Sequence, residues 1–229
     1  MARRPRKASA TAFFHVVNRA ARKQKIFLRP QDYRGFIDVL AAGLKRHPVR
    51  LISFCIMANH WHLVVGPTET RTLSSLLHWV TTTHAVRLNH RRKTIGQGPV
   101  YQGRFRSDPV ETTGDLMRVC RYVERNALRA NLVRRAQDWP WCSLAERLRE
   151  QPALPLVTTP FLASQAWIEH VNAPLTVREQ VAMRTPVPKT AETVESTPVP
   201  DPDPLDDGAQ VPRRLAGSVK GRKRRIRAA

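Results

Sequence analysis

The chain has few acidic residues, few cysteines and no long apolar run. Its 229 residues include 18 Asp and Glu against 39 Lys and Arg, giving a formal net charge of +21. Folding does not require this excess, and its self-repulsion opposes compaction. The charge indicates a polyanionic partner, with nucleic acid as the first candidate and an anionic membrane surface as the second. The longest apolar run, Leu51 to Ala58, is interrupted by Ser53 and falls short of the roughly 20 residues of a spanning helix.

The scarcity of cysteine argues against a disulfide framework. Cys55, Cys120 and Cys142 are odd in number, far apart in the sequence, and form no CxxC pair. We therefore expect buried free thiols rather than disulfides or a zinc site. The N-terminal segment is basic, but no signal-peptide core follows it, which predicts a cytoplasmic protein. We also expect the protein to be associated with the nucleoid and to have no membrane partner.

The periodicity of the apolar residues predicts an α+β domain. Hydrophobic residues make up 41% of the chain, enough for a real core. The expected elements are strand 13–18, helix 30–47, hairpin strands 51–57 and 60–65, a helix capped by Thr72 that reaches Leu88, strand 105–110, and a helix capped by Thr113 that stops at Asn131. Pro109 favours an edge position for the last strand. This order suggests a ferredoxin-like sandwich with a central antiparallel sheet and packed helices.

Composition divides the chain into four segments. We expect a basic N-terminal arm (1–12), the main domain (13–145), a helical extension (146–184) and a disordered basic C-terminal tail (185–229). Weaker helices are expected at 160–171 and 176–183. Residues 185–211 carry six acids against one lysine, and the chain from Arg213 onward carries eight Lys and Arg with no acid. The first composition is typical of disorder, and the second fits either a sequence-independent phosphate clamp or a tolerated solubilising tail.

His60 and His62 form the first constellation that can carry chemistry. On a strand, residues two apart point to the same face, so both imidazoles project together while Trp61 and Leu63 enter the core. Two such imidazoles can bind a divalent metal with one more ligand. Taken alone, the pair also fits two partly buried, hydrogen-bonded histidines.

Tyr122 and Asn126 form the second constellation. They lie four apart on the predicted third helix and therefore share one face, at the flank of its apolar stripe. Alone, they also fit a boundary tyrosine that extends its hydroxyl to water. Together with His60 and His62, they suggest a metal-dependent site that acts on a phosphodiester. A metal on the imidazoles and the Asn126 carbonyl would polarise a phosphodiester, and Tyr122 would attack it and keep the bond energy for rejoining.

Two other tyrosines compete for a functional role. Tyr33 lies on the apolar stripe of the first helix and is expected in the core. Tyr101 lies in a basic, glycine-rich segment with Arg104 and Arg106 nearby. We expect Tyr101 to stack on a base, an interaction that contributes roughly 1–3 kcal/mol, and the arginines to hold phosphates. The same segment also fits a solvated basic loop.

Four segments of the sequence resemble the single-tyrosine HUH transposases, and most closely the branch called REP-associated tyrosine transposases. They are FHVVNR (14–19), MANHWHL (57–63), GRF (103–105) and RYVERNALRANLV (121–133). The likeness runs in order, with family spacing, from about Phe13 to Ser143. It implies a ferredoxin-like HUH catalytic domain over 13–145, a Mg²⁺ or Mn²⁺ cofactor, and single-stranded DNA with hairpins or imperfect palindromes as the substrate.

The resemblance also implies roles for individual residues. Tyr122 is the implied nucleophile, His60 and His62 are metal ligands, and Asn126 resembles the third ligand. The product would be a 5′-phosphotyrosine and a free 3′-hydroxyl. Beside them we expect DNA contacts from Arg19, Tyr101, Arg104, Arg106, Arg121, Arg125 and Arg129.

The sequence departs from the family pattern in the hairpin turn and after the tyrosine. Ala58 stands where the family often has proline. Ala127 also replaces a common proline, which predicts that the helix runs on, because alanine is a good helix former. Asn131 replaces a common glycine and can take the same left-handed conformation.

Three functions remain open from the sequence. The first is a DNA transposase, a metal-dependent nuclease and strand transferase acting on single strands. The second is a catalytically silent protein that binds structured DNA or RNA on the same scaffold. The third is a metal phosphohydrolase that uses His60, His62 and water. Relatives include dimers that share an active site in trans as well as monomers, so a homodimer is one of two expected assemblies.

Overall fold

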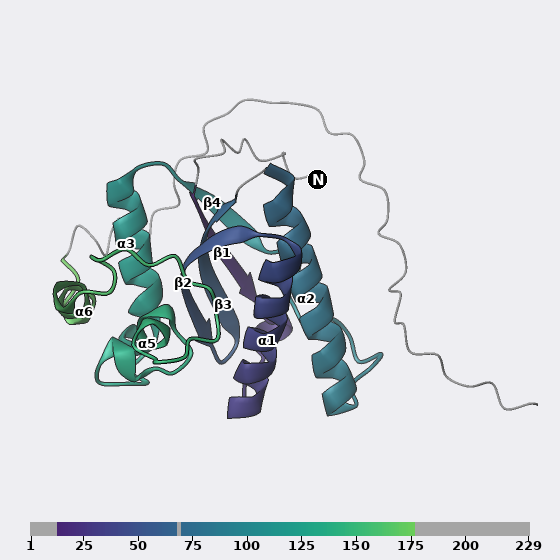
Figure 1. Cartoon of the computed structure of the whole chain (residues 1–229). Helices are drawn as coiled ribbons and strands as arrows, with labels where there is room; N and C mark the ends of the chain where they lie inside the picture. Colours follow the sequence, from purple (N-terminus) through teal and green to yellow (C-terminus); the bar gives the residue numbers. More distant parts are fainter. Residues whose placement is uncertain (1–12, 68–69, 177–229) are drawn as a thin grey trace, which may run out of the picture. The chain divides into compact units, whose positions relative to one another are not determined.

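The computed structural model describes residues 13–67 and 70–176, which are the coloured parts of Figure 1. The expected N-terminal arm (1–12), the disordered tail (185–229) and all but the first residue of the expected helix at 176–183 lie outside the described residues. Among the described helices, none is both long and apolar enough to cross a membrane.

A four-stranded antiparallel sheet forms the centre of the domain. Its strands are β1 (Phe13–Arg19), β2 (Val49–Met57), β3 (His60–Pro67) and β4 (Arg106–Val110), in the order β2-β3-β1-β4. The helix α1 (Pro30–Arg46) connects β1 to β2, and α2 (Thr70–Arg92) connects β3 to β4. This is the split βαβ arrangement of the ferredoxin-like fold, so the predicted fold class is confirmed. Pro109 lies on the edge strand β4, as expected.

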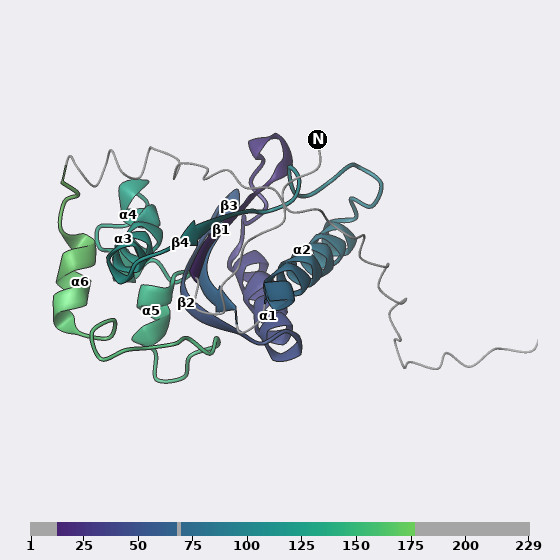
Figure 2. The ribbon, with the colours of Figure 1, turned by 90° about the horizontal axis from the view of Figure 1, so that it is seen from above.

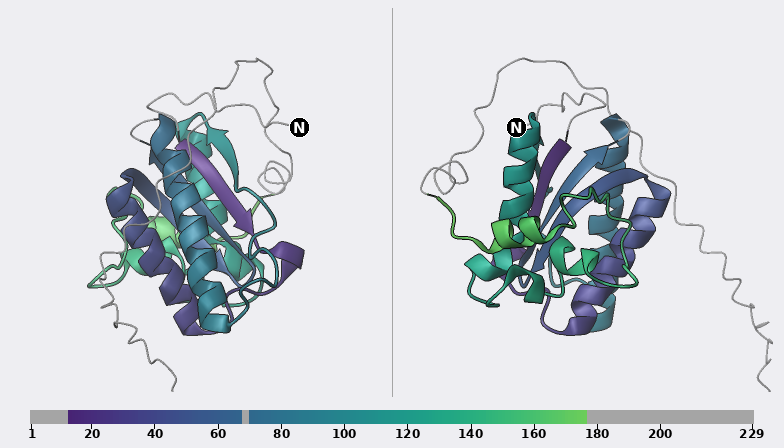
Figure 3. Two further views of the ribbon diagram at one scale, coloured as in Figure 1. Left: turned by 90° about the vertical axis from the view of Figure 1, so that its right-hand side faces the viewer. Right: turned by 60° about the vertical axis from the view of Figure 1, so that its left-hand side comes forward.

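One face of the sheet packs against α1 and α2, which run side by side (Figure 3). Alternate strand residues point to this face, and Phe14, Val16, Trp61 and Leu63 are buried there. The predicted inward direction of Trp61 and Leu63 is therefore confirmed. Gly43 lets the two helices approach closely, because a Cβ at this position would lie 2.7 Å from Val80 Cγ2.

The other face of the sheet is covered by the second half of the described chain, which makes a third layer (Figure 2). Its elements are α3 (Thr113–Glu124), α4 (Asn126–Arg129), the 3-10 turn η2 (Ala136–Asp138), α5 (Ser143–Arg147) and α6 (Gln165–Asn172). A second core forms under them around Cys55, Val64, Val123 and Trp167. A two-layer sandwich would leave this face in water, whereas here it is occupied.

The helix boundaries differ from prediction where capping decides them. α2 begins at Thr70, so Thr72, which was expected to cap it, lies inside the helix. Thr113, which was expected to cap α3, is its first residue, and the cap is Thr112, whose hydroxyl accepts a hydrogen bond of 3.0 Å from the Asp115 amide. Side-chain oxygens at this position satisfy an amide that the helix leaves free.

The helix that carries Tyr122 does not run on unbroken past Asn126. Arg125 has φ −82° and ψ −4°, and α4 follows as a separate turn. Replacing the family's proline by Ala127 therefore does not give a continuous helix. α4 ends in a Schellman motif, in which Leu132 and Asn131 donate to the carbonyls of Ala127 and Leu128. Asn131 has φ 56°, which confirms its predicted left-handed conformation.

Residues 143–174 are fastened to α3 by polar contacts. The buried carboxylate of Glu124 accepts hydrogen bonds from Ser143 Oγ (2.6 Å), Trp167 Nε1 (2.8 Å) and the Arg147 guanidinium. Much of the expected helical extension therefore packs against the helix that bears Tyr122.

The three cysteines are free and buried, as predicted. Burial raises the pKa of each thiol above its ordinary value, so all three stay protonated at neutral pH.

Candidate active site

His60 and His62 project from the same face of β3, with ring centroids 5.0 Å apart. His60 directly follows the turn that joins β2 to β3, and it lies opposite Arg19 of β1. His62 lies opposite Val17 on one side and Cys55 on the other. The predicted turn at Ala58 and Asn59 thus places both imidazoles at the end of a central strand.

A neighbouring side chain fixes each imidazole. His60 Nδ1 is hydrogen-bonded to Asn59 Oδ1 at 2.7 Å. His62 Nδ1 is hydrogen-bonded to His15 Nε2 at 3.0 Å, and these two rings stack with centroids 5.2 Å apart. Partners of this kind fix ring orientation and tautomer, which leaves Nε2 of each ring for a metal.

His15 is the residue that sequence reasoning missed. Its position in the family-like segment 14–19 was visible, but its contact with His62 depends on how β1 pairs with β3. His15 lies opposite Val64, one diagonal step from His62 on the same face. The sequence signal was a histidine on a neighbouring strand, at a position that faces the same side of the sheet as His60 and His62.

The histidines are neutral at neutral pH. Burial lowers the pKa of His15 and of His60 to about 4. Burial also lowers the pKa of His62 well below its ordinary value, and the positive charges of Arg19 and Arg129 act in the same direction on His60 and His62. A neutral imidazole keeps the lone pair that a metal needs.

Tyr122 of α3 lies over the same face of the sheet and in the same chain. Its ring centroid is 5.7 Å from that of His62 and 6.0 Å from that of His15, both in edge-to-face geometry. The side chain is half-buried. The structure therefore brings the Tyr122 phenol close to the His60 and His62 pair, which lies about 60 residues earlier in the sequence.

Arg129 joins Tyr122 to Asn126. Its guanidinium lies 4.9 Å from the centroid of the Tyr122 ring and donates to the phenol oxygen at 3.3 Å and to Asn126 Oδ1 at 3.2 Å. Asn126 is buried, and its Nδ2 donates to the Tyr122 carbonyl at 3.2 Å. A cation in this position stabilises negative charge on the phenol oxygen.

The donor set fits a cation that accepts both nitrogen and oxygen ligands. Within residues 13–67 and 70–176, no three His, Cys, Asp or Glu side chains gather closely enough to hold a metal. A metal on His60 and His62 therefore needs oxygen ligands such as Asn126 Oδ1 or a substrate phosphate. Mg²⁺ prefers oxygen, and imidazole nitrogens suit Mn²⁺ as a substitute.

Tyr101 corrects one of the sequence predictions. Its ring is buried, and its hydroxyl is hydrogen-bonded to Trp61 Nε1 at 3.2 Å and to His84 Nδ1 at 2.7 Å. The expectation that Tyr101 stacks on a base is wrong, because the ring is part of the core under α2. The glycines and arginines around Tyr101 are typical of an exposed loop, and the sequence alone does not show that the ring is buried.

Arg121 and Arg125 also differ from expectation. Arg121 is buried and donates to the carbonyls of Ala173 and Pro174, and Arg125 donates to those of Val171 and Asn172. The prediction that they contact DNA is corrected: both guanidinium groups bind backbone carbonyls of residues 171–174, at the end of α6 and just after it.

The other predicted DNA contacts remain at the surface. Arg19, Arg104, Arg106 and Arg129 are exposed. Arg106 forms an ion pair of 2.7 Å with Asp108, and Arg19 lies at the end of β1 beside His60. These four side chains therefore remain candidates for holding phosphates.

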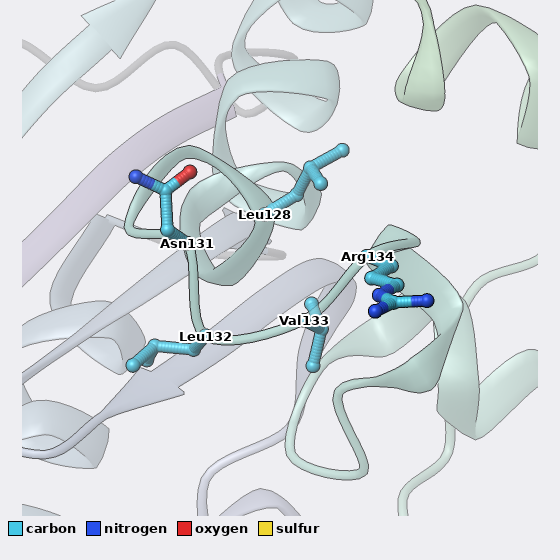
Figure 4. Close-up of a pocket in the computed structure, with 5 residues that line it drawn as sticks. All are labelled: Leu128, Asn131, Leu132, Val133 and Arg134. Carbon is cyan, nitrogen blue, oxygen red and sulfur yellow. The ribbon is translucent and has the colours of Figure 1, made fainter.

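An open hollow lies at the end of α4 and is drawn in Figure 4. Its volume is about 420 Å³, and it is lined by Leu128, Asn131, Leu132, Val133 and Arg134. None of its lining residues is a histidine or a tyrosine, so it is separate from the candidate site.

Comparison with known proteins agrees with the geometry. The family model of IS200-like transposases matches residues 9–126, more than half of the chain. No curated protein matches this chain significantly. A solved REP-associated tyrosine transposase bound to a REP hairpin has 17% identity and a TM-score of 0.54, over 72% of this chain and 98% of its own. At this identity the likeness shows the fold alone.

A second solved structure, assigned as a transposase of Deinococcus radiodurans, has 12% identity and a TM-score of 0.38, over 54% of this chain and 97% of its own. The matched family region includes the histidine pair, Tyr122 and Asn126. The chain belongs to the IS200-like transposase family.

Proposed function

We propose that this transposase is a metal-dependent single-stranded DNA endonuclease and strand transferase that forms a 5′-phosphotyrosine through Tyr122. One observation carries the proposal. The Tyr122 ring lies 5.7 Å from His62 within one chain, and Arg129 donates to its phenol oxygen. A phenol and two neutral imidazoles on one sheet face are the parts that this chemistry requires.

The metal would be held by His60 Nε2, His62 Nε2 and Asn126 Oδ1, with Mg²⁺ or Mn²⁺ as the cation. When bound, the cation supplies Lewis-acid polarisation of the scissile phosphate. His15 and Asn59 keep the two rings in place through their Nδ1 atoms. Arg129 donates to Asn126 Oδ1 at 3.2 Å and would help to orient this third donor.

The cleavage step exchanges one phosphoester bond for another. The Tyr122 oxygen loses its proton, attacks the phosphorus and forms the new bond, while the bond to the 3′-oxygen breaks. The departing 3′-oxygen takes up a proton, which balances the proton lost by the phenol, and the phosphate stays on the 5′ end of the downstream strand, bonded to Tyr122. Arg129 stabilises the negative charge on the phenol oxygen before attack. Rejoining is the reverse step, in which a 3′-hydroxyl attacks the phosphotyrosine.

We infer that the substrate is single-stranded DNA that contains hairpins or imperfect palindromes. The net charge of +21 favours a polyanion. The fold is shared with a transposase that was solved bound to a REP hairpin. A homodimer is compatible with the family, but the described contacts place Tyr122 beside the histidines of its own chain.

A covalent-adduct assay tests the proposed function. Wild-type protein is incubated with labelled hairpin-bearing single-stranded DNA and Mn²⁺, and a protein–DNA band is sought under denaturing conditions. We expect the band with wild type and none with Tyr122→Phe, which keeps the ring and loses only the nucleophile. Tyr33→Phe serves as the matched control, because Tyr33 is a buried residue of α1.

The other outcomes separate the alternatives. Cutting by both wild type and Tyr122→Phe would identify a hydrolase that uses the histidines and water. Retarded DNA with no cutting under any metal would identify a silent binding protein.

A further inference from the structure

The loop between β1 and α1, residues 20–29, exposes several cations. Arg22, Lys23 and Lys25 are exposed, and this stretch contains no acidic residue. None of the three forms an ion pair with a described residue. The cations of α2 behave differently, since Arg91 and Arg92 both pair with the buried carboxylate of Asp32. We call residues 20–29 the β1–α1 loop.

The backbone of the β1–α1 loop is held in a rare conformation. Arg22 has φ 52° and Lys23 has φ 58°, two consecutive left-handed residues of which neither is glycine. Residues other than glycine rarely adopt this conformation, and it persists only where surrounding contacts determine it. The single turn η1 (Ala21–Lys23) is the visible result.

The surrounding contacts come from the turn that precedes His60. The amide of Ala20 donates to the Asn59 carbonyl at 2.9 Å, and the amides of Ile26 and Phe27 donate to the Ala58 carbonyl at 2.9 and 3.0 Å. Both ends of the cationic stretch are thus tied to the β2–β3 turn. The loop therefore presents its cations in a fixed place.

One side chain connects the loop directly to the candidate site. Asn59 Nδ2 donates to the Lys23 carbonyl at 3.3 Å, while Asn59 Oδ1 is bonded to His60 Nδ1 at 2.7 Å. Arg19, the residue just before the loop, lies opposite His60. These cations therefore stand at the His60 end of the site, near the histidine pair whose metal would polarise the scissile phosphate.

We propose that the β1–α1 loop binds the backbone phosphates of the single strand next to the scissile phosphate. This inference rests on the proposed function, because it takes the phosphate at His60 and His62 as its starting point. Several exposed cations along a short rigid loop match a chain of regularly spaced anions. Side chains of Lys and Arg on phosphates position a strand without reading its sequence.

The experiment measures binding in a protein that cannot cut. In a Tyr122→Phe background, Arg22→Gln, Lys23→Gln and Lys25→Gln are combined. The control combines Arg34→Gln, Lys45→Gln and Arg46→Gln, which removes the same charge from exposed positions of α1. Dissociation constants are measured over a range of salt for a hairpin with a single-stranded extension and for the same hairpin without it.

We expect the loop variant to reduce the salt slope for the extended hairpin by about 2, since each single-strand phosphate contributes about 0.7. At 0.1 M salt this corresponds to roughly 10- to 100-fold weaker binding. We expect the control to keep the wild-type slope, and both variants to keep the wild-type melting temperature.

Two results would overturn the inference: a slope equal to that of the control, or an equal loss on the hairpin without its extension. If the loop variant folds poorly, Lys25→Gln alone, outside the left-handed pair, decides with an expected slope change of about 0.7. The covalent-adduct assay is independent. No adduct with a clear loop effect refutes only the proposed function, and an adduct without a loop effect refutes only this inference.

Discussion

Replacing Glu124 by alanine should strongly destabilise the protein. The carboxylate is fully buried, and it accepts hydrogen bonds from Ser53 Oγ (3.1 Å), Ser143 Oγ (2.6 Å), Trp167 Nε1 (2.8 Å) and the Arg147 guanidinium. These partners come from β2, α5 and α6, so one side chain of α3 joins most of the third layer.

The magnitude follows from what the substitution leaves behind. The Arg147 side chain is only 2% exposed, so without Glu124 it becomes a buried, uncompensated charge. Breaking a buried pair in this way costs about 3–5 kcal/mol. For a domain of this size, each kcal/mol lowers the melting temperature by about 2–4 °C. We expect Glu124→Ala to lower it by roughly 6–20 °C.

A double variant separates the charge from the packing. Glu124→Leu combined with Arg147→Met removes both charges and retains apolar volume, and we expect it to be more stable than Glu124→Ala. Glu150→Ala, at an exposed position, is the control and should change the free energy of unfolding by less than about 0.5 kcal/mol. Urea and thermal unfolding followed by circular dichroism give all four values.

A loss of less than about 1 kcal/mol in the free energy of unfolding of Glu124→Ala, well under the expected range, would refute this prediction. The prediction also fails if the double variant is as unstable as the single one, because the buried arginine would then not be the source of the loss. Since Tyr122 lies on the same helix, adduct formation per folded molecule reports whether the network also positions the nucleophile.

The remaining predictions concern titration, the core tyrosine and the arginine beside the nucleophile. The folded pKa values of His15 and His60 are about 4, below the unfolded value of 6.5, so the unfolded chain binds protons first and stability should fall as pH drops from 6.5 to 4. Urea midpoints across this range check it; a rise on acidification would contradict it. Tyr101→Phe should cost about 1–3 kcal/mol by leaving Trp61 Nε1 without its partner, with hairpin affinity unchanged; weaker hairpin binding in the folded variant would restore a direct role. Arg129→Gln should slow adduct formation at saturating DNA by about 100- to 1,000-fold, the effect of one charge-stabilising donor, while Arg134→Gln, exposed nearby, should not; equal rates would contradict the role of Arg129.

The features that the sequence predicted correctly are local ones. The order of strands and helices, the shared face of His60 and His62, the inward direction of Trp61 and the left-handed Asn131 all follow from periods of 2 or 3.6 residues and from single-residue conformational preferences. These depend on neighbours in the chain, which the sequence displays directly. The predicted cap of α3 was wrong by one residue, because several side chains near a helix start are able to cap it.

Depth and long-range pairing were decided only by the tertiary structure. Tyr101, Arg121 and Arg125 look like surface residues among basic neighbours, yet Tyr101 and Arg121 are buried and Arg125 donates to carbonyls of α6. The hydrogen bond between His15 and His62 exists because β1 and β3 pair in one register. The approach of Tyr122 to the histidines requires α3 to cross the far face of the sheet. Such contacts arise from how surfaces separated by many residues fit together, and no local period of the sequence encodes that fit.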